Sequence, residues 1–223
     1  MEDFNKKIIK TIILGSDNYP ELLKEIYDPP AKLFFRGDLS GLKKTCLAIV
    51  GSRACSYYGR KIVQDLVPAL IKNDVVIVSG LARGIDCLAQ EKTIAEGGLT
   101  IGVLGSGIDN NSIYPKENLK LAEEIINRGG AIISEFYPGS PPQKQNFPKR
   151  NRIISGLTKA VLIVEAGEKS GSLITARCAL EQGREVLSVP GNIGSPASIG
   201  TNNLIKLGAR PVTCVEDVLE ALT

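Results

Sequence analysis

Histidine is absent from this chain of 223 residues. Three kinds of functional site depend on the imidazole ring: the Ser-His-Asp triad, the Cys-His dyad and the metal site with histidine ligands. The sequence excludes all three. Paired cysteines are absent as well. The five cysteines are widely scattered and include no C-x-x-C pair for zinc or redox chemistry. Their odd number does not indicate a secreted disulfide framework either.

Long apolar runs are also missing. No stretch approaches the roughly 18 apolar residues of a membrane span, and residues 1–7 lack the apolar core of a signal peptide. A strong net charge of one sign is absent too, since the chain has 27 lysines and arginines and 24 aspartates and glutamates. We therefore expect a cytoplasmic protein with no membrane partner. Any anion-binding face must arise from local clustering of cations.

What the chain does contain is typical of an α/β protein. Its length predicts one or two domains, and its 43% apolar residues can form a substantial core. From about residue 45, short β-branched runs alternate with helix-length stretches. This alternation predicts right-handed crossovers in a parallel, doubly wound sheet. Strands are expected at 46–50, 75–79, 100–104, 131–134, 160–165, 185–189 and 211–214, and helices at 59–72, 85–96, 117–127, 173–182, 202–207 and 216–222.

Residues 1–44 do not follow this alternation. Proline and glycine interrupt them at Tyr19-Pro20, Asp28-Pro29-Pro30 and Arg36-Gly37-Asp38. We therefore expect residues 1–44 to form an N-terminal extension packed on a main domain of residues 45–223.

The most unusual local sequence covers residues 147–157. Three cations and an amide stand together between an aromatic-proline pair and apolar residues. Because a solvated charge run would have polar neighbours, we expect these cations to be held on a fixed surface. Fixed cations beside glycine-rich turns favour binding of a nucleic-acid backbone. The aromatic and polar residues concerned are Phe147, Lys149, Arg150, Asn151 and Arg152.

Glycine and hydroxyl side chains gather where the predicted strands end. Ligands of open α/β sheets bind beyond the carboxyl ends of the strands, where glycines admit a close approach and helix N-termini attract anions. Ser52 and Arg53 follow the first strand, and residues 170–175 follow the fifth. Such residues also serve simply to end strands and cap helices. Five or six such turns on one edge, beside fixed cations, favour a phosphate-binding edge.

Two nucleotide-binding motifs, G-x-G-x-x-G and G-x-x-x-x-G-K-[ST], are absent. Carboxylates do stand at the strand ends and could hold a metal ion as in a nuclease. Unpaired carboxylates would repel a phosphate chain, so we expect them instead to accept backbone hydrogen bonds or to pair with arginine. No cofactor or metal is therefore expected. The carboxylates are Asp86, Asp109, Glu135 and Glu165, and the candidate arginines are Arg53, Arg83 and Arg152.

Aromatic residues near these turns have two interpretations. Tyr57-Tyr58 could stack on bases, although packing or dimer contacts are the commoner role of such a pair at a helix start. Phe147 either faces a base or anchors the core. Cys55 and Cys87 follow strand ends without a nearby histidine or second thiol, so we expect them to be structural.

Taken in order, these motifs resemble the DNA-processing protein A family (DprA, also called Smf). The order and spacing match over nearly the whole chain from residue 19, and the set is specific although each motif alone is weak. The matching stretches are Tyr19-Pro20, Pro29-Pro30, Arg36-Gly37, residues 48–53, 79–86 and 105–109, Tyr114-Pro115, Ser134-Glu135, residues 147–157 and 164–176, Pro190-Gly191, Gly200-Thr201-Asn202, Leu204-Ile205 and Gly208-Ala209.

The resemblance implies an extended Rossmann-like domain that forms a homodimer and binds single-stranded DNA without sequence preference. It implies no enzymatic activity, and it implies help in loading the RecA recombinase on DNA taken up during natural transformation. Carried onto this chain, the predicted nucleic-acid-binding residues are Ser52, Arg53, Lys116, Lys144, Phe147, Lys149, Arg150, Asn151, Arg152, Ser170, Gly171, Ser172 and Thr175.

Two departures from the family stand out. Gln90 occupies a position where the family usually has histidine, which removes any pH-dependent role there without harming phosphate binding. Many members also carry a C-terminal winged-helix module. This chain stops at Thr223, where the Rossmann-like domain of the family ends, so we expect no winged helix. The sequence leaves open whether this is a natural short form or a trimmed one.

Two other functions fit the same fold. Phosphoribohydrolases that cleave nucleotides have similar glycine-rich turns, and Glu165 or Glu135 would then be the acid–base residue. The chain lacks their Pro-Gly-Gly-x-Gly-Thr turn, which residues 167–172 only approximate. A nucleotide sensor would use the pocket without turnover. The set of motifs favours the DNA-binding interpretation over both.

Overall fold

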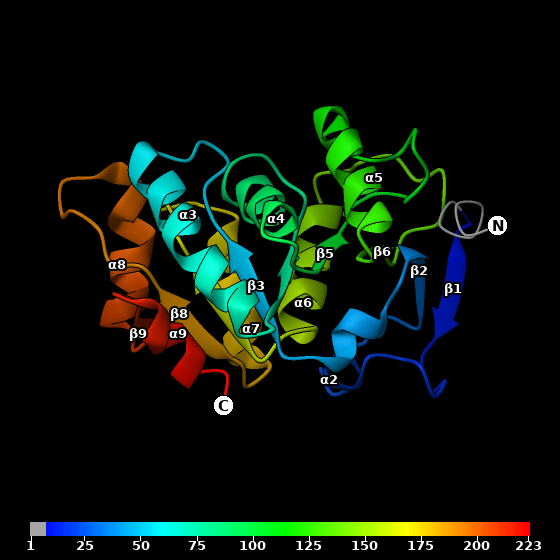
Figure 1. Ribbon diagram of the computed structural model, residues 1–223, viewed down its shortest axis with the longest axis horizontal. Coiled ribbons are helices and arrows are strands. Elements are labelled where there is room, and N and C mark those ends of the chain that lie inside the picture. Colours follow the sequence, from blue (N-terminus) through cyan, green and yellow to red (C-terminus); the bar gives the residue numbers. More distant parts are fainter. Residues whose placement is uncertain (1–7) are drawn as a thin grey trace.

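Nine strands form one sheet in the computed structural model, which describes residues 8–223 (Figure 1). Their order is β1-β2-β6-β5-β4-β3-β7-β8-β9, and all pairs from β6 to β9 are parallel. The topological switch point lies between β3 and β7. The strands are β1 (Lys10–Ile13), β2 (Lys32–Gly37), β3 (Cys46–Val50), β4 (Val76–Ser79), β5 (Thr100–Val103), β6 (Ala131–Ser134), β7 (Ala160–Ile163), β8 (Glu185–Ser188) and β9 (Arg210–Pro211).

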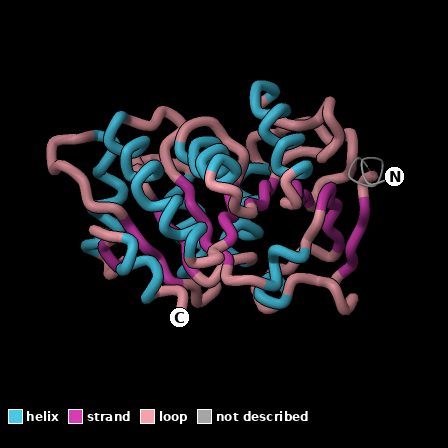
Figure 2. Tube along the Cα trace, in the orientation of Figure 1, coloured by secondary structure: helices cyan, strands magenta, loops and turns pink. Residues whose placement is uncertain are grey.

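Helices cover both faces of this sheet (Figure 2). Residues of α3, α4 and α9 pack on one face, and residues of α2, α6 and α7 pack on the other. The mostly parallel, doubly wound α/β fold is therefore confirmed. The helices are α2 (Glu21–Lys24), α3 (Tyr57–Lys72), α4 (Ile85–Ala95), α5 (Leu119–Asn127), α6 (Asn146–Gly156), α7 (Ser172–Glu181), α8 (Ile199–Lys206) and α9 (Val215–Glu220), with short 3-10 turns η1 (Ser40–Lys43), η2 (Lys116–Asn118) and η3 (Pro196–Ser198).

The central strands are apolar throughout because both of their faces are covered. In β3, Leu47 and Ile49 point into one core cluster, whereas Ala48 and Val50 point into the other. All are at most 2% exposed. This double burial explains why the strands read as continuous apolar runs in the sequence. None of the helices formed by residues 8–223 has the length and apolar character needed to cross a bilayer.

The N-terminal segment joins the sheet as two strands, which the sequence analysis does not predict. β2 pairs antiparallel with β6, with Phe34 opposite Ser134, and β1 pairs antiparallel with β2. Gly37 ends β2 with φ of +96°, and a side chain there would collide with the backbone at Gly130. In β1 only Ile12 is buried, and β2 begins with Lys32 and ends with Arg36-Gly37, so neither strand has the uniformly apolar sequence of β3. Residues 1–7 of the predicted extension lie outside the described residues.

Helix α6 is a second element that the sequence analysis does not predict. It covers the cationic segment, from Asn146 to Gly156. Polar side chains occupy its inner positions, because Arg150 and Asn151 are buried beside Ile153 and Ile154. Helical periodicity is read from apolar residues, so polar residues at core positions conceal it.

Candidate nucleic-acid interface

Three side chains form an exposed cluster beyond the carboxyl ends of β3 and β5. The guanidinium carbon of Arg53 lies 5.5 Å from the centroid of the Phe147 ring. The Tyr114 ring also lies next to Phe147, with 5.8 Å between centroids and 53° between ring planes. Both geometries are attractive, the first as a cation–π contact and the second as a tilted aromatic pair. We call Arg53, Phe147 and Tyr114 the central cluster.

The central cluster is assembled from segments far apart in sequence. Arg53 belongs to the turn after β3, Tyr114 to the loop before η2, and Phe147 to the first turn of α6. Gly105, after β5, makes room for the aromatic ring, because a Cβ there would lie 3.0 Å from it. Phe147 is half-buried, so it rests on Gly105 and still presents part of its ring to solvent. Phe147 therefore packs on the protein and leaves part of its ring open to a ligand.

The turn that carries Ser52 and Arg53 is tied to helix α4. The Ile85 N–H donates to the Ser52 carbonyl at 3.1 Å. Gly84, with φ of +77°, precedes Ile85 at a point where a side chain would collide with the backbone of Ser52 and Arg53. The Arg53 side chain is exposed, and it forms no ion pair with any carboxylate of residues 8–223. Its charge is therefore available to an anionic ligand.

Arg150 differs from the expectation of cations fixed on a surface, because it is only 4% exposed. Its guanidinium donates to the Gly80 carbonyl at 2.6 Å and to the Val103 carbonyl. Burial lowers the pKa of Arg150 to about 10, an effect that the nearby Asp86 opposes. Arg150 therefore remains charged at neutral pH and links α6 to the ends of β4 and β5. A polar core position, which sequence patterning treats as exposed, explains the difference.

Asp86 is the buried counterpart of Arg150. Its carboxylate accepts the Gly80 N–H at 3.1 Å and further backbone hydrogen bonds from Gly51 and Ala82. Burial raises the pKa of Asp86, while Arg150 and the three backbone donors act in the opposite direction. Gly80 fits between the two charges, since a Cβ there would lie 2.7 Å from the Arg150 guanidinium. Asp86 and Arg150 thus hold the turns after β3 and β4 in place.

Arg152 is also engaged within the protein. It pairs with Glu135 at 2.7 Å and with Asp28 at 3.1 Å, and its side chain is only 18% exposed. These contacts connect α6 to the end of β6 and to the N-terminal segment. Arg152 would reach a phosphate only by giving up part of this pairing.

The remaining predicted cations are exposed. Lys116, Lys144 and Lys149 form no ion pair among the residues that the structure describes. Lys116 begins η2, two residues after Tyr114, and Lys144 precedes α6. Lys149 lies two residues after Phe147 on α6, which is about 200° around the helix. The structure therefore does not bring Lys149 and Phe147 onto one face.

The turn before α7 lies beside helix α6. The Asn151 amide donates to the Gly171 carbonyl at 3.2 Å, and the hydroxyls of Ser170 and Ser172 are 2.8 Å apart. Ser172 and Thr175 are buried, whereas Gly171 is exposed. Only the Ser170–Gly171 part of this turn is open to a ligand without rearrangement.

The carboxylates at the strand ends are bonded as expected. Asp109 accepts the Gly139 N–H at 2.6 Å, Glu165 accepts both the N–H and the hydroxyl of Ser56, and Asp86 and Glu135 have the partners given above. Within residues 8–223, no group of three or more Cys, Asp or Glu side chains is arranged to hold a metal ion.

Gln90 and Asn118 support the site in a way that sequence reasoning misses. Leu81 follows β4 with φ of +52°, a rare conformation for a leucine. Its N–H donates to the Gln90 side chain at 3.2 Å, and its carbonyl accepts from Asn118 at 2.9 Å. Gln90 is fully buried, so this side chain lies beneath the turn rather than on its surface. The positive φ of Leu81 cannot be read from the sequence, so these partners could not be predicted from it.

A small cavity of about 350 Å³ lies near the switch point, next to Glu165 and the loop after β8. The Tyr58 hydroxyl donates to the Pro190 carbonyl at 2.8 Å at its rim. Tyr58 therefore contacts protein, whereas Tyr57 is 83% exposed. Cys55 and Cys87 are half-buried free thiols, and burial raises the pKa of Cys87 to about 12. Such a thiol is unreactive at neutral pH.

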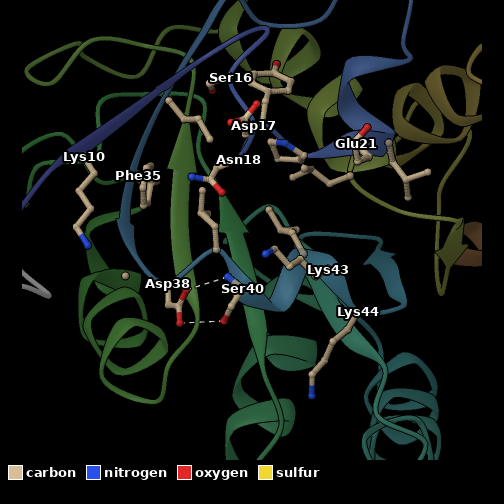
Figure 3. Close-up of a pocket in the computed structure, with 18 of the residues that line it drawn as sticks. Lys10, Ser16, Asp17, Asn18, Glu21, Phe35, Asp38, Ser40, Lys43 and Lys44 are labelled. Atoms are coloured by element: carbon tan, nitrogen blue, oxygen red, sulfur yellow. Dashed lines mark hydrogen bonds between the residues drawn. The ribbon is translucent and has the colours of Figure 1, made fainter.

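A second cavity, of about 1510 Å³, lies elsewhere (Figure 3). Its walls come mainly from β1, residues 16–22 and residues 37–45, and Lys10, Phe35 and Lys43 are among the residues that line it. Thr45 and Lys159, which precede β3 and β7, also line it, so it lies toward the amino ends of the parallel strands. None of the predicted nucleic-acid-binding residues lines it. This second cavity is therefore separate from the central cluster.

Comparison with known proteins agrees with the resemblance seen in the sequence. The protein Smf of Escherichia coli is 50% identical over 207 residues, which cover 93% of this chain and 55% of that protein. The DNA processing protein DprA of Bacillus subtilis is 46% identical over 220 residues, covering 98% of this chain and 73% of that protein. The chain thus spans little more than half of the Escherichia coli relative.

Two solved structures share the fold closely. DprA from Streptococcus pneumoniae superposes with a TM-score of 0.90 at 43% identity, over 99% of this chain and 77% of that one. The DNA processing protein A of Helicobacter pylori, described with a single-stranded DNA binding mode, gives a TM-score of 0.85 at 32% identity, over 97% of both chains. A molybdenum cofactor binding protein of Rippkaea orientalis, at 16% identity and a TM-score of 0.56, shares the fold alone. The family described as DNA recombination-mediator protein A matches residues 10–223, and this chain belongs to that family.

Proposed function

We propose that this chain binds single-stranded DNA without sequence preference at the carboxyl ends of its parallel strands. The observation that carries the proposal is the central cluster, in which an unpaired, exposed arginine lies over one of two neighbouring aromatic rings. Non-specific single-strand binders combine cations for the phosphates with aromatic rings for the bases, each stacked base contributing about 1–3 kcal/mol. Relatives named as DNA processing proteins, and the DNA-binding mode described for the Helicobacter pylori protein, support the same assignment.

Binding is expected to weaken as salt concentration rises, because cations that bind phosphates release counterions. Three or four unpaired cations (Arg53, Lys116, Lys144 and Lys149) predict a slope of about −2 to −3 for log K against log salt on single strands. Fluorescence anisotropy of a labelled dT oligonucleotide at several salt concentrations measures this slope. An affinity independent of salt would contradict phosphate binding by these residues.

The proposal extends to a role in recombination. We infer that the chain acts in the cytoplasm as a homodimer and helps to load RecA on single strands taken up during transformation. The family description as a recombination mediator supports this role. With RecA and a long dT strand, adding the chain should shorten the lag before steady ATP hydrolysis. An unchanged lag, together with demonstrated DNA binding, would limit the function to strand binding.

The alternative functions require a free acid–base residue or a nucleotide pocket. Glu165 borders the 350 Å³ cavity, but both of its oxygens accept hydrogen bonds from Ser56, and Glu135 is paired with Arg152. These contacts favour binding over catalysis. Turnover of a mononucleotide by the purified chain would favour the hydrolase, and saturable mononucleotide binding without turnover would favour the sensor.

A further inference from the structure

We infer that the bound single strand continues from the central cluster to a second contact point formed by Tyr137, Phe34 and Lys32. This inference rests on the proposed function, and it identifies where the rest of the strand lies. Tyr137 is 65% exposed although it is aromatic, and its ring meets Phe34 with 5.0 Å between centroids at 52°. The Lys32 ammonium lies 5.5 Å from the Tyr137 centroid and 5.9 Å from that of Phe34.

The second contact point repeats the chemistry of the first. In each, a more buried phenylalanine supports an exposed tyrosine at a tilted angle, and a cation lies over an aromatic ring. Lys32, like Arg53, has no carboxylate within ion-pair distance in the described part of the chain. An exposed ring and an unpaired cation are the two features that a base and its phosphate require.

Both contact points lie on the same edge of the sheet. Phe34 pairs with Ser134, the last residue of β6, and Tyr137 follows that strand by three residues. Since β6 is parallel to β5, its carboxyl end faces the same way as the end that holds Phe147. Lys32, at the start of the antiparallel strand β2, reaches this edge as well.

A single three-residue turn connects the two points. A Cβ on Gly105 would lie 3.0 Å from the Phe147 ring, and a Cβ on Gly107 would lie 2.9 Å from the Tyr137 carbonyl oxygen. The two aromatic residues therefore flank the Gly105–Gly107 turn after β5. Strands are about 4.8 Å apart, so the path from β3 to β6 crosses three spacings, about 14 Å. At about 3.4 Å per stacked nucleotide, that distance corresponds to about four nucleotides.

The loop that carries Tyr137 is already fixed by internal hydrogen bonds. Asp109 accepts the Gly139 N–H at 2.6 Å, and the Gly107 N–H donates to the Ser140 carbonyl at 2.9 Å. A loop held in this way loses little conformational entropy on binding. Tyr137 is therefore presented to a ligand in a fixed position.

Measuring the affinity of variants for a labelled dT20 strand tests the inference. Tyr137→Ala should weaken binding by about fivefold or more, the lower limit for losing one stacked base. Tyr137→Phe, which keeps the ring, should bind within about twofold of the parent chain. Lys32→Ala should also weaken binding, whereas Lys72→Ala should not, because Lys72 ends α3 near the amino ends of the strands.

A second measurement locates the contact directly. Ultraviolet crosslinking of a dT20 strand containing 5-iododeoxyuridine should yield adducts on the peptide with Tyr137 as well as on the peptide with Phe147. Adducts confined to Phe147, with Tyr137→Ala binding like the parent chain and Arg53→Ala binding weakly, would overturn the second contact point and leave the proposed function intact. If the parent chain binds no dT20 at all, both proposals fail.

Discussion

Arg150→Ala is expected to lower the free energy of unfolding by about 3–5 kcal/mol, because it removes a buried, hydrogen-bonded cation that lies near the buried carboxylate of Asp86. The guanidinium is 4% exposed and donates to two carbonyls, those of Gly80 and Val103. Its loss leaves both carbonyls without this donor and leaves Asp86 buried without its neighbouring cation. Urea denaturation measures the effect directly.

Lys149→Ala is the matched control for this prediction. It removes the adjacent cation of the same helix, but from an exposed position, so a change within about 0.5 kcal/mol is expected. Arg150→Lys should be destabilising as well, because an ammonium cannot reproduce the fork geometry of guanidinium. If Arg150→Ala cost less than about 1 kcal/mol, the residue would not be structural, and its assignment as a direct phosphate ligand would gain support.

Arg53→Ala is expected to weaken single-stranded DNA binding by about 1–3 kcal/mol, which is about 5- to 150-fold. Arg53 is exposed and its contact is with the Phe147 ring, so its charge is available for a phosphate. The stability of the protein should hardly change, because no hydrogen bond or ion pair of Arg53 is lost among the described residues. Anisotropy with dT20, beside thermal denaturation of the same sample, separates the two effects.

Arg128→Ala provides the control for charge alone. Arg128 is exposed at the end of α5, just before β6, and so lies toward the amino ends of the strands. Its removal should leave DNA affinity within about twofold. Phe147→Ala combined with Arg53→Ala should cost less than the sum of the single losses, because the two side chains form one contact. Unchanged affinity in a folded Arg53→Ala protein would place the binding site elsewhere.

The sheet could be predicted from residue 45 onward because strands covered on both faces appear in the sequence as continuous apolar runs. A continuous apolar run such as Cys46–Val50 is typical of a strand that is buried on both faces. β1 and β2 carry no such run: β1 is the edge strand and has one buried residue, and β2, between β1 and β6, has Lys32 at its start and Arg36-Gly37 at its end. Helix α6 could not be predicted because Arg150 and Asn151 occupy buried positions, where a helical pattern would have apolar residues.

The sequence indicates at which edge of the sheet the candidate site lies, but not which of its cations are free to bind a ligand. Glycine turns after parallel strands meet at one edge by topology alone, so Ser52, Arg53 and Phe147 come together as the sequence suggests. Which cations are free depends instead on distant partners. Arg152 is paired with Glu135, and Arg150 is buried near Asp86, while Arg53 stays unpaired. Such pairings join residues far apart along the chain, and spacing gives no sign of them.

The most direct test of single-strand binding at the strand ends is anisotropy with labelled dT oligonucleotides of increasing length, each compared with its duplex at two salt concentrations. The account predicts salt-sensitive binding that favours single strands and strengthens as the strand grows long enough to pass the central cluster. Binding to no oligonucleotide, or equal binding to single strands and duplexes, would contradict it.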